Sequence, residues 1–255
     1  MFIPILTYHK IQGHSNCGFL SIPLKTFERQ IALLADKGYE TISIADYIDG
    51  QEKLDKKIII TFDDAYASVY EFAFPVLKRY HFIATIFVIT NYVGQYNSWD
   101  FPYRKNKILH CDWKAIEDLA QEGWEIGSHT VTHPDLKSLP AKRVWYELES
   151  SKSVLEEKIQ KSVHSLAYPY GRFNAEVIRS VAKVGYKAGC TLGQNYPYNQ
   201  QIPYALFRRG VYGFEPFGLF EVKLRNTYLS HFDDLKQKCL TFCAKGSILL
   251  RSADR

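Results

Sequence analysis

The sequence predicts an α/β protein whose parallel strands form a closed or nearly closed (β/α) barrel. Short apolar runs alternate with amphipathic segments from end to end, which is the order of parallel strands joined by helical crossovers. A chain of 255 residues accommodates roughly six to eight such units, a number that suits a barrel. No linker, repeat or low-complexity segment interrupts this order. We therefore expect a single domain over residues 1–255, with residues 225–255 as a helical C-terminal extension.

In the N-terminal half, apolar runs predict the strands and amphipathic periodicity predicts the helices. The expected strands cover residues 3–7, 41–43, 57–62 and 84–89. The expected helices cover residues 25–37, 44–48 and 68–80. Gly38 follows the first helix where a C-cap glycine belongs, and Pro75 predicts a kink or a late start in the third helix.

The same alternation continues in the C-terminal half. The expected helices cover residues 113–121, 141–158 and 175–184, and Pro140 suits the first turn of the second. The expected strands cover residues 124–127, 165–168, 187–191 and 207–212. The loop at residues 91–109 is long and rich in aromatic side chains, and loops of that length inside a compact domain are often functional.

Composition excludes several classes of protein. Hydrophobic residues make up 46% of the chain, which supports a real core and argues against disorder. The net charge of +5 comes from 32 basic and 27 acidic residues spread along the chain. Since no basic tract is present, we expect neither a nucleic acid nor an anionic membrane as partner.

The cysteines and the N-terminus indicate the compartment. Five scattered cysteines make a disulfide framework unexpected and favour a reduced compartment; they are Cys17, Cys111, Cys190, Cys239 and Cys243. The last two lie four residues apart in an expected helix with no second pair nearby, so we interpret them as buried thiols. There is no signal-peptide pattern and no apolar stretch of the roughly 20 residues that span a membrane. We therefore expect a cytoplasmic protein without a transmembrane segment.

Polar side chains gather where the expected strands end. His9 follows the first strand, and Asp63 and Asp64 follow the strand at residues 57–62. His129 comes just after the strand at residues 124–127, and Tyr168 ends the strand at residues 165–168. The carboxyl ends of parallel strands converge on one face of a barrel, where active sites are built. This coincidence predicts one catalytic face.

The residue types in these clusters indicate a metal site. His129 and His133 are four residues apart and share one face if a helical turn is present, a spacing that lets two imidazoles chelate one ion. Adjacent carboxylates point in different directions, so one of Asp63 and Asp64 can bind the ion while the other faces the substrate. A capping role for the Asp pair is the structural alternative. Two histidines and one carboxylate leave positions open for water, with zinc the default and manganese, cobalt or nickel compatible.

Four motifs together resemble those of the polysaccharide deacetylases, the NodB-homology or carbohydrate esterase family 4 group. They are TFDD at residues 61–64, SHTVTH at 128–133, YH at 8–9 and AYPYG at 167–171. The last two resemble the branch that includes the poly-N-acetylglucosamine deacetylases. The resemblance runs from about residue 3 to residue 212.

The resemblance implies a distorted (β/α) barrel of about seven parallel strands and a metal-dependent deacetylation. On that basis Asp64, His129 and His133 hold the divalent ion. Asp63 is the general base toward the attacking water. The backbone N–H of Tyr170 helps the ion to stabilise the oxyanion.

The chain departs from the common family pattern in two places. No Arg precedes the Pro-Tyr of the third motif, and the late histidine motif that usually supplies the general acid is not evident. In the branch that the motif at residues 8–9 resembles, the N-terminal Tyr-His supplies a histidine to the site, so the resemblance implies His9 as the acid. We expect it to have a pKa near neutral, the alternative being a purely structural histidine. We expect Arg208 to orient Asp63, with Arg209 and Arg172 as alternatives.

Three functions are compatible with these residues. The leading one is removal of N-acetyl groups from an N-acetylated polysaccharide or glycoconjugate. The second is an O-acetyl esterase or other amide hydrolase, since the same water activation serves esters and amides. The third is a non-catalytic carbohydrate-binding relative, which would have no need of the second carboxylate. The sequence does not predict the sugar, the linkage or the oligomeric state.

Overall fold

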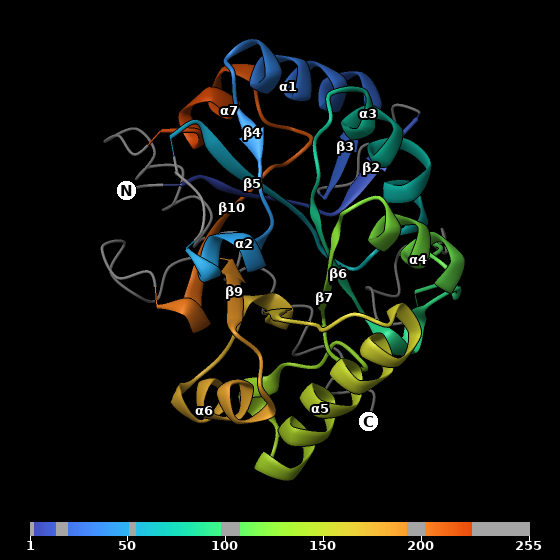
Figure 1. Cartoon of the computed structure of the whole chain (residues 1–255), viewed down its shortest axis with the longest axis vertical. Helices are drawn as coiled ribbons and strands as arrows, with labels where there is room; N and C mark the ends of the chain where they lie inside the picture. The colour runs from blue at the N-terminus through green and yellow to red at the C-terminus, as the bar shows by residue number, and fades with distance from the viewer. Residues whose placement is uncertain (1–2, 14–19, 51–54, 98–107, 193–201, 226–255) are drawn as a thin grey trace.

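The structure, a computed structural model, describes residues 3–13, 20–50, 55–97, 108–192 and 202–225. Its centre is a closed barrel of seven parallel strands, as predicted (Figure 1). They are β1 (Ile5–Tyr8), β5 (Lys57–Phe62), β6 (Thr85–Val88), β7 (Glu125–Ser128), β8 (Ser165–Ala167), β9 (Ala188–Leu192) and β10 (Leu206–Gly210). The first strand closes the barrel because it pairs with both β10 and β5. A short strand, β4 (Glu40–Thr41), lies beside the start of β5.

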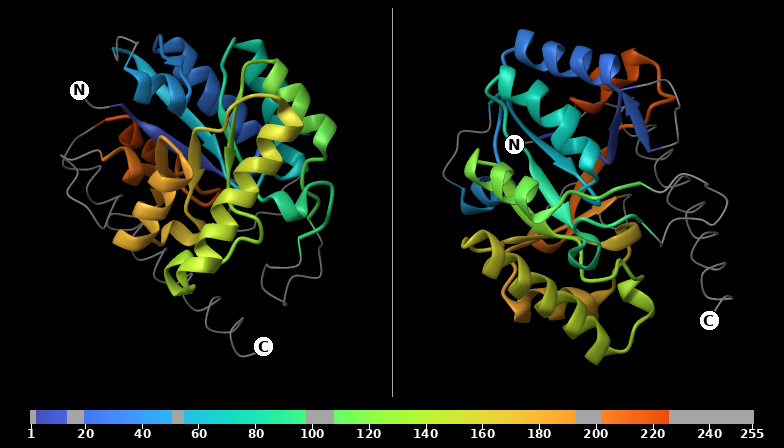
Figure 2. Two further views of the ribbon diagram at one scale, coloured as in Figure 1. Left: turned by 60° about the horizontal axis from the view of Figure 1, so that its bottom comes forward. Right: turned by 90° about the vertical axis from the view of Figure 1, so that its right-hand side faces the viewer.

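Helices surround the strands, as the views in Figure 2 show. They are α1 (Leu24–Asp36), α2 (Ile44–Asp49), α3 (Phe74–Arg79), α4 (Trp113–Gln121), α5 (Ala141–Ile159), α6 (Ala175–Val184) and α7 (Phe217–Lys223). The apolar face expected for the first helix is the buried one, since Phe27, Ile31 and Leu34 are fully covered. Burying an apolar helix face removes its side chains from water and packs them against the barrel wall.

Three features of the fold were not predicted or were predicted only loosely. Two strands of three residues each, β2 (Lys10–Gln12) and β3 (Ser21–Pro23), form a separate parallel pair. Such short strands carry no readable alternation of polar and apolar residues. The helix α7 was also not predicted. A π-helical turn, η1 (Val69–Ala73), precedes α3, which starts late with Pro75 in its first turn, one of the two expected outcomes.

Several expectations concern the parts of the chain outside the described residues. The C-terminal extension at residues 225–255 falls there apart from residue 225, as do Cys17, Cys239 and Cys243. Within the described residues, Cys111 and Cys190 are buried free thiols. No described helix combines the length and the apolar character needed to cross a membrane. The single-domain and cytoplasmic assignments stay predictions.

Candidate metal centre

The chain turns sharply where β5 ends, and this turn separates two adjacent carboxylates. Asp63 and Asp64 are both 2% exposed. The Asp63 amide still donates to the Tyr8 carbonyl at 3.0 Å, continuing the pairing with β1. Asp64 and Ala65 then adopt left-handed backbone conformations, with φ of 69° and 49°. Asp63 therefore faces β10, whereas Asp64 faces the loop that follows β7.

Asp64, His129 and His133 form a buried group that could hold a metal ion. The Nε2 atoms of His129 and His133 lie 3.5 and 3.7 Å from Asp64 Oδ1. One ligand atom from each residue lies within 4.8 Å of the others. Two imidazole nitrogens and one carboxylate oxygen at such spacing match the donor set of zinc and related divalent ions. The residues thus fit a divalent ion, and their number leaves coordination positions for water and substrate.

The tautomer of His129 is fixed by the hydrogen bond that its ring nitrogen Nδ1 makes. His129 Nδ1 lies 2.8 Å from the Ala167 carbonyl oxygen of β8. Because a carbonyl can only accept, Nδ1 carries the proton and Nε2 presents its lone pair toward Asp64. Burial, the largest effect, lowers the pKa of His129, which keeps the ring neutral as a metal ligand requires.

The two histidines converge through a loop, without the helical turn that would place them on one face by spacing alone. The loop contains two non-glycine residues with positive φ, Thr130 at 69° and His133 at 55°. Glu147 of α5 holds it in shape by accepting from the amides of Val131 and Thr132, both at 2.9 Å. Local sequence spacing alone could not reveal this loop conformation, because the Glu147 carboxylate that holds it comes from the following helix.

Asp63 forms a two-pronged ion pair with Arg208 of β10. The guanidinium nitrogens Nη1 and Nη2 donate to Oδ1 and Oδ2 at 2.7 and 2.8 Å, and Arg208 is fully buried. Nη1 also donates to Thr61 Oγ1 at 3.1 Å. Burial alone would raise the pKa of Asp63, but the Arg208 charge and its hydrogen bonds, with His129 and His9, hold that pKa below its usual value. Asp63 is therefore ionised at neutral pH.

The two alternative arginines make other contacts. Arg209 donates to the carbonyls of Lys223 and Arg225 at 2.7 and 2.8 Å, which ties β10 to the end of α7. Arg172 Nε lies 3.1 Å from Asp135 Oδ2, linking the loops that follow β8 and β7. Among the three arginines considered from the sequence, Arg208 is thus the one in contact with Asp63.

His9 follows β1 and is half-buried at the same end of the barrel. Its ring feels the charges of Asp63, Arg208 and His129, which places it near Asp63. Burial, the largest effect, lowers the pKa of His9 to about 4, although Asp63 works in the opposite direction. The expectation of a near-neutral pKa is therefore wrong for the metal-free protein.

Tyr170 packs directly on the metal-binding group. Its ring lies 4.7 Å from that of His133, centroid to centroid, at an interplanar angle of 64°. Its backbone is left-handed, with φ of 58°, inside the short 3-10 turn Pro169–Gly171. The following Gly171 has a φ of 63° and lies so close to the Leu192 backbone that a Cβ there would meet the Leu192 carbonyl oxygen at 2.5 Å. The turn that contains Tyr170 thus depends on a glycine.

Sequence reasoning missed two residues that contact the site. Glu147 is a fully buried acid that lies between Val144 and Leu148 on the apolar face of α5, and a carboxylate in that position was a readable signal. His110 lies in the loop before α4, and its Nδ1 is 2.6 Å from the Asp64 carbonyl oxygen. A lone histidine in a loop carries no comparable signal.

Comparison with known proteins gives a consistent family. A family model described as polysaccharide deacetylase matches residues 50–189, more than half of the chain. A Bacillus subtilis relative named as a polysaccharide deacetylase, YxkH, is 33% identical over 210 residues, which cover 81% of this chain and 70% of the relative. A poly-beta-1,6-N-acetyl-D-glucosamine N-deacetylase of Staphylococcus epidermidis is 33% identical over 197 residues, covering 71% of this chain and 65% of the relative. The chain thus spans about two thirds of these relatives.

Solved structures extend the similarity over most of the chain. The Streptococcus pyogenes deacetylase PplD, determined in complex with acetate, matches with a TM-score of 0.75 and 26% identity over 88% of this chain and 98% of PplD. IcaB from Ammonifex degensii matches with a TM-score of 0.71 and 25% identity over 87% of this chain and 95% of IcaB. On the family match and the relationship to YxkH, the chain belongs to the polysaccharide deacetylase family.

Proposed function

We propose that the protein is a metal-dependent N-deacetylase that removes acetyl groups from an N-acetylated glycan and releases acetate. One observation carries the proposal above all. The two adjacent carboxylates at the end of β5 have different partners, Asp64 facing two imidazoles and Asp63 facing a guanidinium. A hydrolase that uses an ion and a separate base needs this division, whereas a carbohydrate-binding protein has no use for it.

Asp64, His129 and His133 are the residues that would hold the ion. Zinc is the first expectation for two imidazoles and a carboxylate, and manganese, cobalt or nickel would also accept these ligands. When bound, a divalent ion would supply Lewis-acid activation of water and of the acyl carbonyl. The neutral, oriented ring of His129 is prepared for this role by its bond to the Ala167 carbonyl.

Asp63 is proposed as the general base. Its lowered pKa keeps it ionised at neutral pH, so that it can accept a proton from the attacking water. Arg208 restrains the carboxylate by two hydrogen bonds, which limits the orientations in which the base can act. The low pKa also makes Asp63 a moderate base, and its contribution relies on position more than on basicity.

His9 and Tyr170 are proposed to act on the leaving group and on the developing charge. His9 would donate the proton that the departing amine needs, a step that an activated ester does not require. Because its pKa is lowered to about 4, His9 is neutral at the start and would gain its proton during the reaction, when Asp63 passes on the proton that it has taken from the attacking water. The Tyr170 amide, presented by the Gly171 turn, would donate to the oxyanion.

The substrate class is proposed from the relatives. Several of them are named poly-beta-1,6-N-acetyl-D-glucosamine N-deacetylases, at 33% and 28% identity. We therefore favour a β-1,6-linked N-acetylglucosamine polymer over a chitin-type one. An O-acetyl ester is the second candidate, because the same base and ion would serve it.

Acetate release from matched oligomers tests the proposal. Purified protein is incubated with β-1,6-linked and β-1,4-linked N-acetylglucosamine oligomers and with an O-acetylated glycan, each with and without a chelator. We expect chelator-sensitive acetate release that is fastest with the β-1,6-linked oligomer. Release from the O-acetylated glycan alone would replace the amide by the ester, and release that resists metal removal would contradict the metal-dependent mechanism.

A further inference from the structure

We propose that His110 is a positioning residue that holds the metal ligand Asp64 in its left-handed backbone conformation and thereby sets the affinity of the site for metal. The inference rests on the metal centre proposed above and adds a residue outside the ligand set. His110 comes from the loop before α4, 46 positions from Asp64 in the sequence.

The contact is a short hydrogen bond to the backbone of the ligand. His110 Nδ1 lies 2.6 Å from the Asp64 carbonyl oxygen, and His110 is 2% exposed. Because the carbonyl only accepts, Nδ1 carries the proton and the tautomer is fixed. The bond therefore restrains the peptide group that follows the ligand, while the Asp64 carboxylate stays directed toward His129 and His133.

The backbone at this point needs restraint. A non-glycine residue in the left-handed region is held there at an energetic cost of order 1 kcal/mol or more, and Asp64 and Ala65 occupy it in succession. The carbonyl oxygens of three successive residues, 64 to 66, each accept a hydrogen bond from residues 110–111. His110 Nδ1 donates to the Asp64 carbonyl. The Cys111 amide donates to the Ala65 carbonyl at 2.7 Å, and Cys111 Sγ donates to the Tyr66 carbonyl at 3.4 Å.

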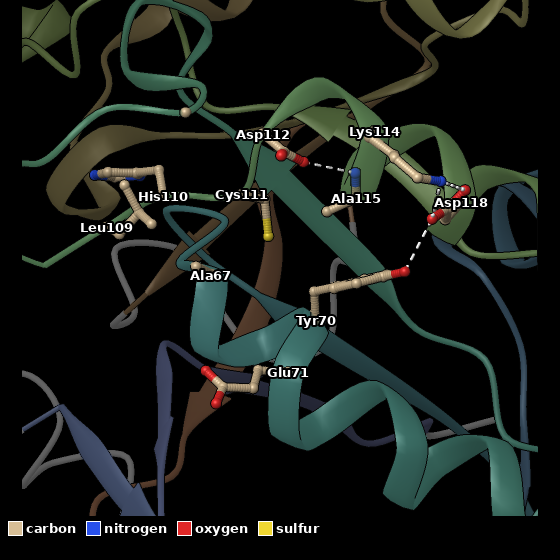
Figure 3. Close-up of a pocket in the computed structure, with 11 residues that line it drawn as sticks. Ala67, Tyr70, Glu71, Leu109, His110, Cys111, Asp112, Lys114, Ala115 and Asp118 are labelled. Atoms are coloured by element: carbon tan, nitrogen blue, oxygen red, sulfur yellow. Dashed lines mark hydrogen bonds and ion pairs between the residues drawn. The ribbon is translucent and has the colours of Figure 1, made fainter.

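The donor is itself held in place. The His110 ring contacts the rings of Tyr66 and Tyr92, at centroid distances of 4.8 and 5.5 Å. The Cys111 carbonyl accepts from the Gly94 amide at 2.9 Å, and Asp112 caps α4 through the Ala115 amide at 2.8 Å. Figure 3 shows His110 and Cys111 on the segment that leads into this helix. A rigid helix thus anchors the turn that carries the metal ligand.

The test compares side chains that keep or remove the donor at the Nδ1 position. In His110→Asn the side-chain amide nitrogen is attached to Cγ, the same number of covalent bonds from Cβ as Nδ1 of histidine. In His110→Gln the amide nitrogen is one covalent bond farther from Cβ, and in His110→Leu there is no such nitrogen. His81→Asn, at an exposed position with a φ of 55° before β6, is the matched control. The dissociation constant of zinc is measured for each metal-free protein by competition with a chelator, together with its melting temperature.

We expect His110→Leu and His110→Gln to weaken zinc binding by about 10-fold or more, the usual effect of losing a partner that orients a ligand. His110→Asn and His81→Asn should stay within about 3-fold of the parent protein, which is below that range. The ordering should hold among variants with similar melting temperatures. If His110→Leu fails to fold, the comparison of Asn with Gln carries the test.

Two outcomes separate the inference from the function on which it rests. A parent protein that binds no zinc at this site would overturn the proposed metal centre itself. A parent protein that binds zinc, with His110→Leu and His110→Gln binding it equally well, would overturn the role of His110 and leave the metal centre intact.

Discussion

Two acidic side chains at opposite ends of the barrel show how different partners give the same chemical group two different environments. Asp63 follows β5 at the carboxyl end, and Glu125 opens β7 at the amino end. Glu125 accepts from the Ser165 and Thr85 hydroxyls at 2.7 and 3.0 Å. It also accepts from the two amides that open α2, at 2.8 and 3.1 Å. Asp63 instead pairs with a buried guanidinium.

The pKa values of the two acids move in opposite directions for this reason. Burial raises the pKa of Glu125, and its neutral donors do not compensate. Burial also acts to raise the pKa of Asp63, but the Arg208 charge outweighs it. A network of neutral donors fastens strands and helix together, whereas a charged partner keeps an acid ionised and oriented. The difference separates a structural carboxylate from a candidate base.

The largest predicted effect tests this difference directly. Asp63→Asn removes the proposed base but keeps the shape of the side chain, so we expect acetate release to fall by about 100-fold or more while the protein stays folded. Glu125→Gln is the matched substitution at the other end, and we expect its activity within a few-fold of the parent. Steady-state rates for the two variants give the comparison. Comparable losses in both, or full activity in Asp63→Asn, would remove the distinction.

Arg208 can be changed to sharpen the same comparison. In Arg208→Met the carboxylate of Asp63 is buried without its charged partner, a situation that costs about 3–5 kcal/mol of unfolding free energy. The pKa of Asp63 then rises, so the acidic limb of the pH–rate profile should move to higher pH. Ser165→Ala, which removes one neutral donor from Glu125, should cost about 1 kcal/mol and leave that limb in place. Denaturant titrations measure the free energy of unfolding of the two variants, and pH–rate profiles measure the position of the acidic limb. An acidic limb that does not move in Arg208→Met would contradict the role given to Arg208.

His9→Ala should affect substrates unequally. A departing amine needs a proton and an activated phenolate does not, so we expect the loss of rate on an N-acetyl substrate to exceed that on an activated acetate ester by about 10-fold or more. Parallel assays of both substrates on the same preparation measure the ratio. Equal losses would assign His9 to structure or binding.

The sequence allowed much of this fold to be predicted, because barrel strands and their helices leave local patterns. The strand at residues 57–62 and the helices α4 and α6 were predicted with their observed bounds. Arg208 was the first of three arginines expected beside Asp63, but the contact spans 145 positions and depends on β1 joining β5 to β10, so no local pattern could decide among the three. The bond from His110 to Asp64 is another such contact. The loop geometry of His129 and His133 was missed because Glu147 imposes it from outside the motif.

A smaller effect concerns stability against pH in the metal-free protein. Burial lowers the pKa of His9 and of His110 to about 4. Well above pH 6.5 both histidines are neutral in the folded and the unfolded chain, so they no longer make the free energy of unfolding depend on pH. As the pH falls from about 6.5 to about 4, the unfolded chain binds protons that the folded chain does not. Stability should therefore fall by about 1.4 kcal/mol per pH unit for each histidine. Chemical denaturation at several pH values should show a shallower slope in His9→Asn, and an unchanged slope would contradict the lowered pKa of His9.

The metal content of two neighbouring variants tests the central claim most directly. Asp63→Asn and Asp64→Asn are purified alongside the parent protein, loaded with zinc, freed of excess ion and analysed for bound metal per chain. We predict close to one ion per chain in the parent and in Asp63→Asn, and a marked loss in Asp64→Asn. Equal metal content in the two variants, or loss in Asp63→Asn alone, would contradict the division of roles between the two carboxylates.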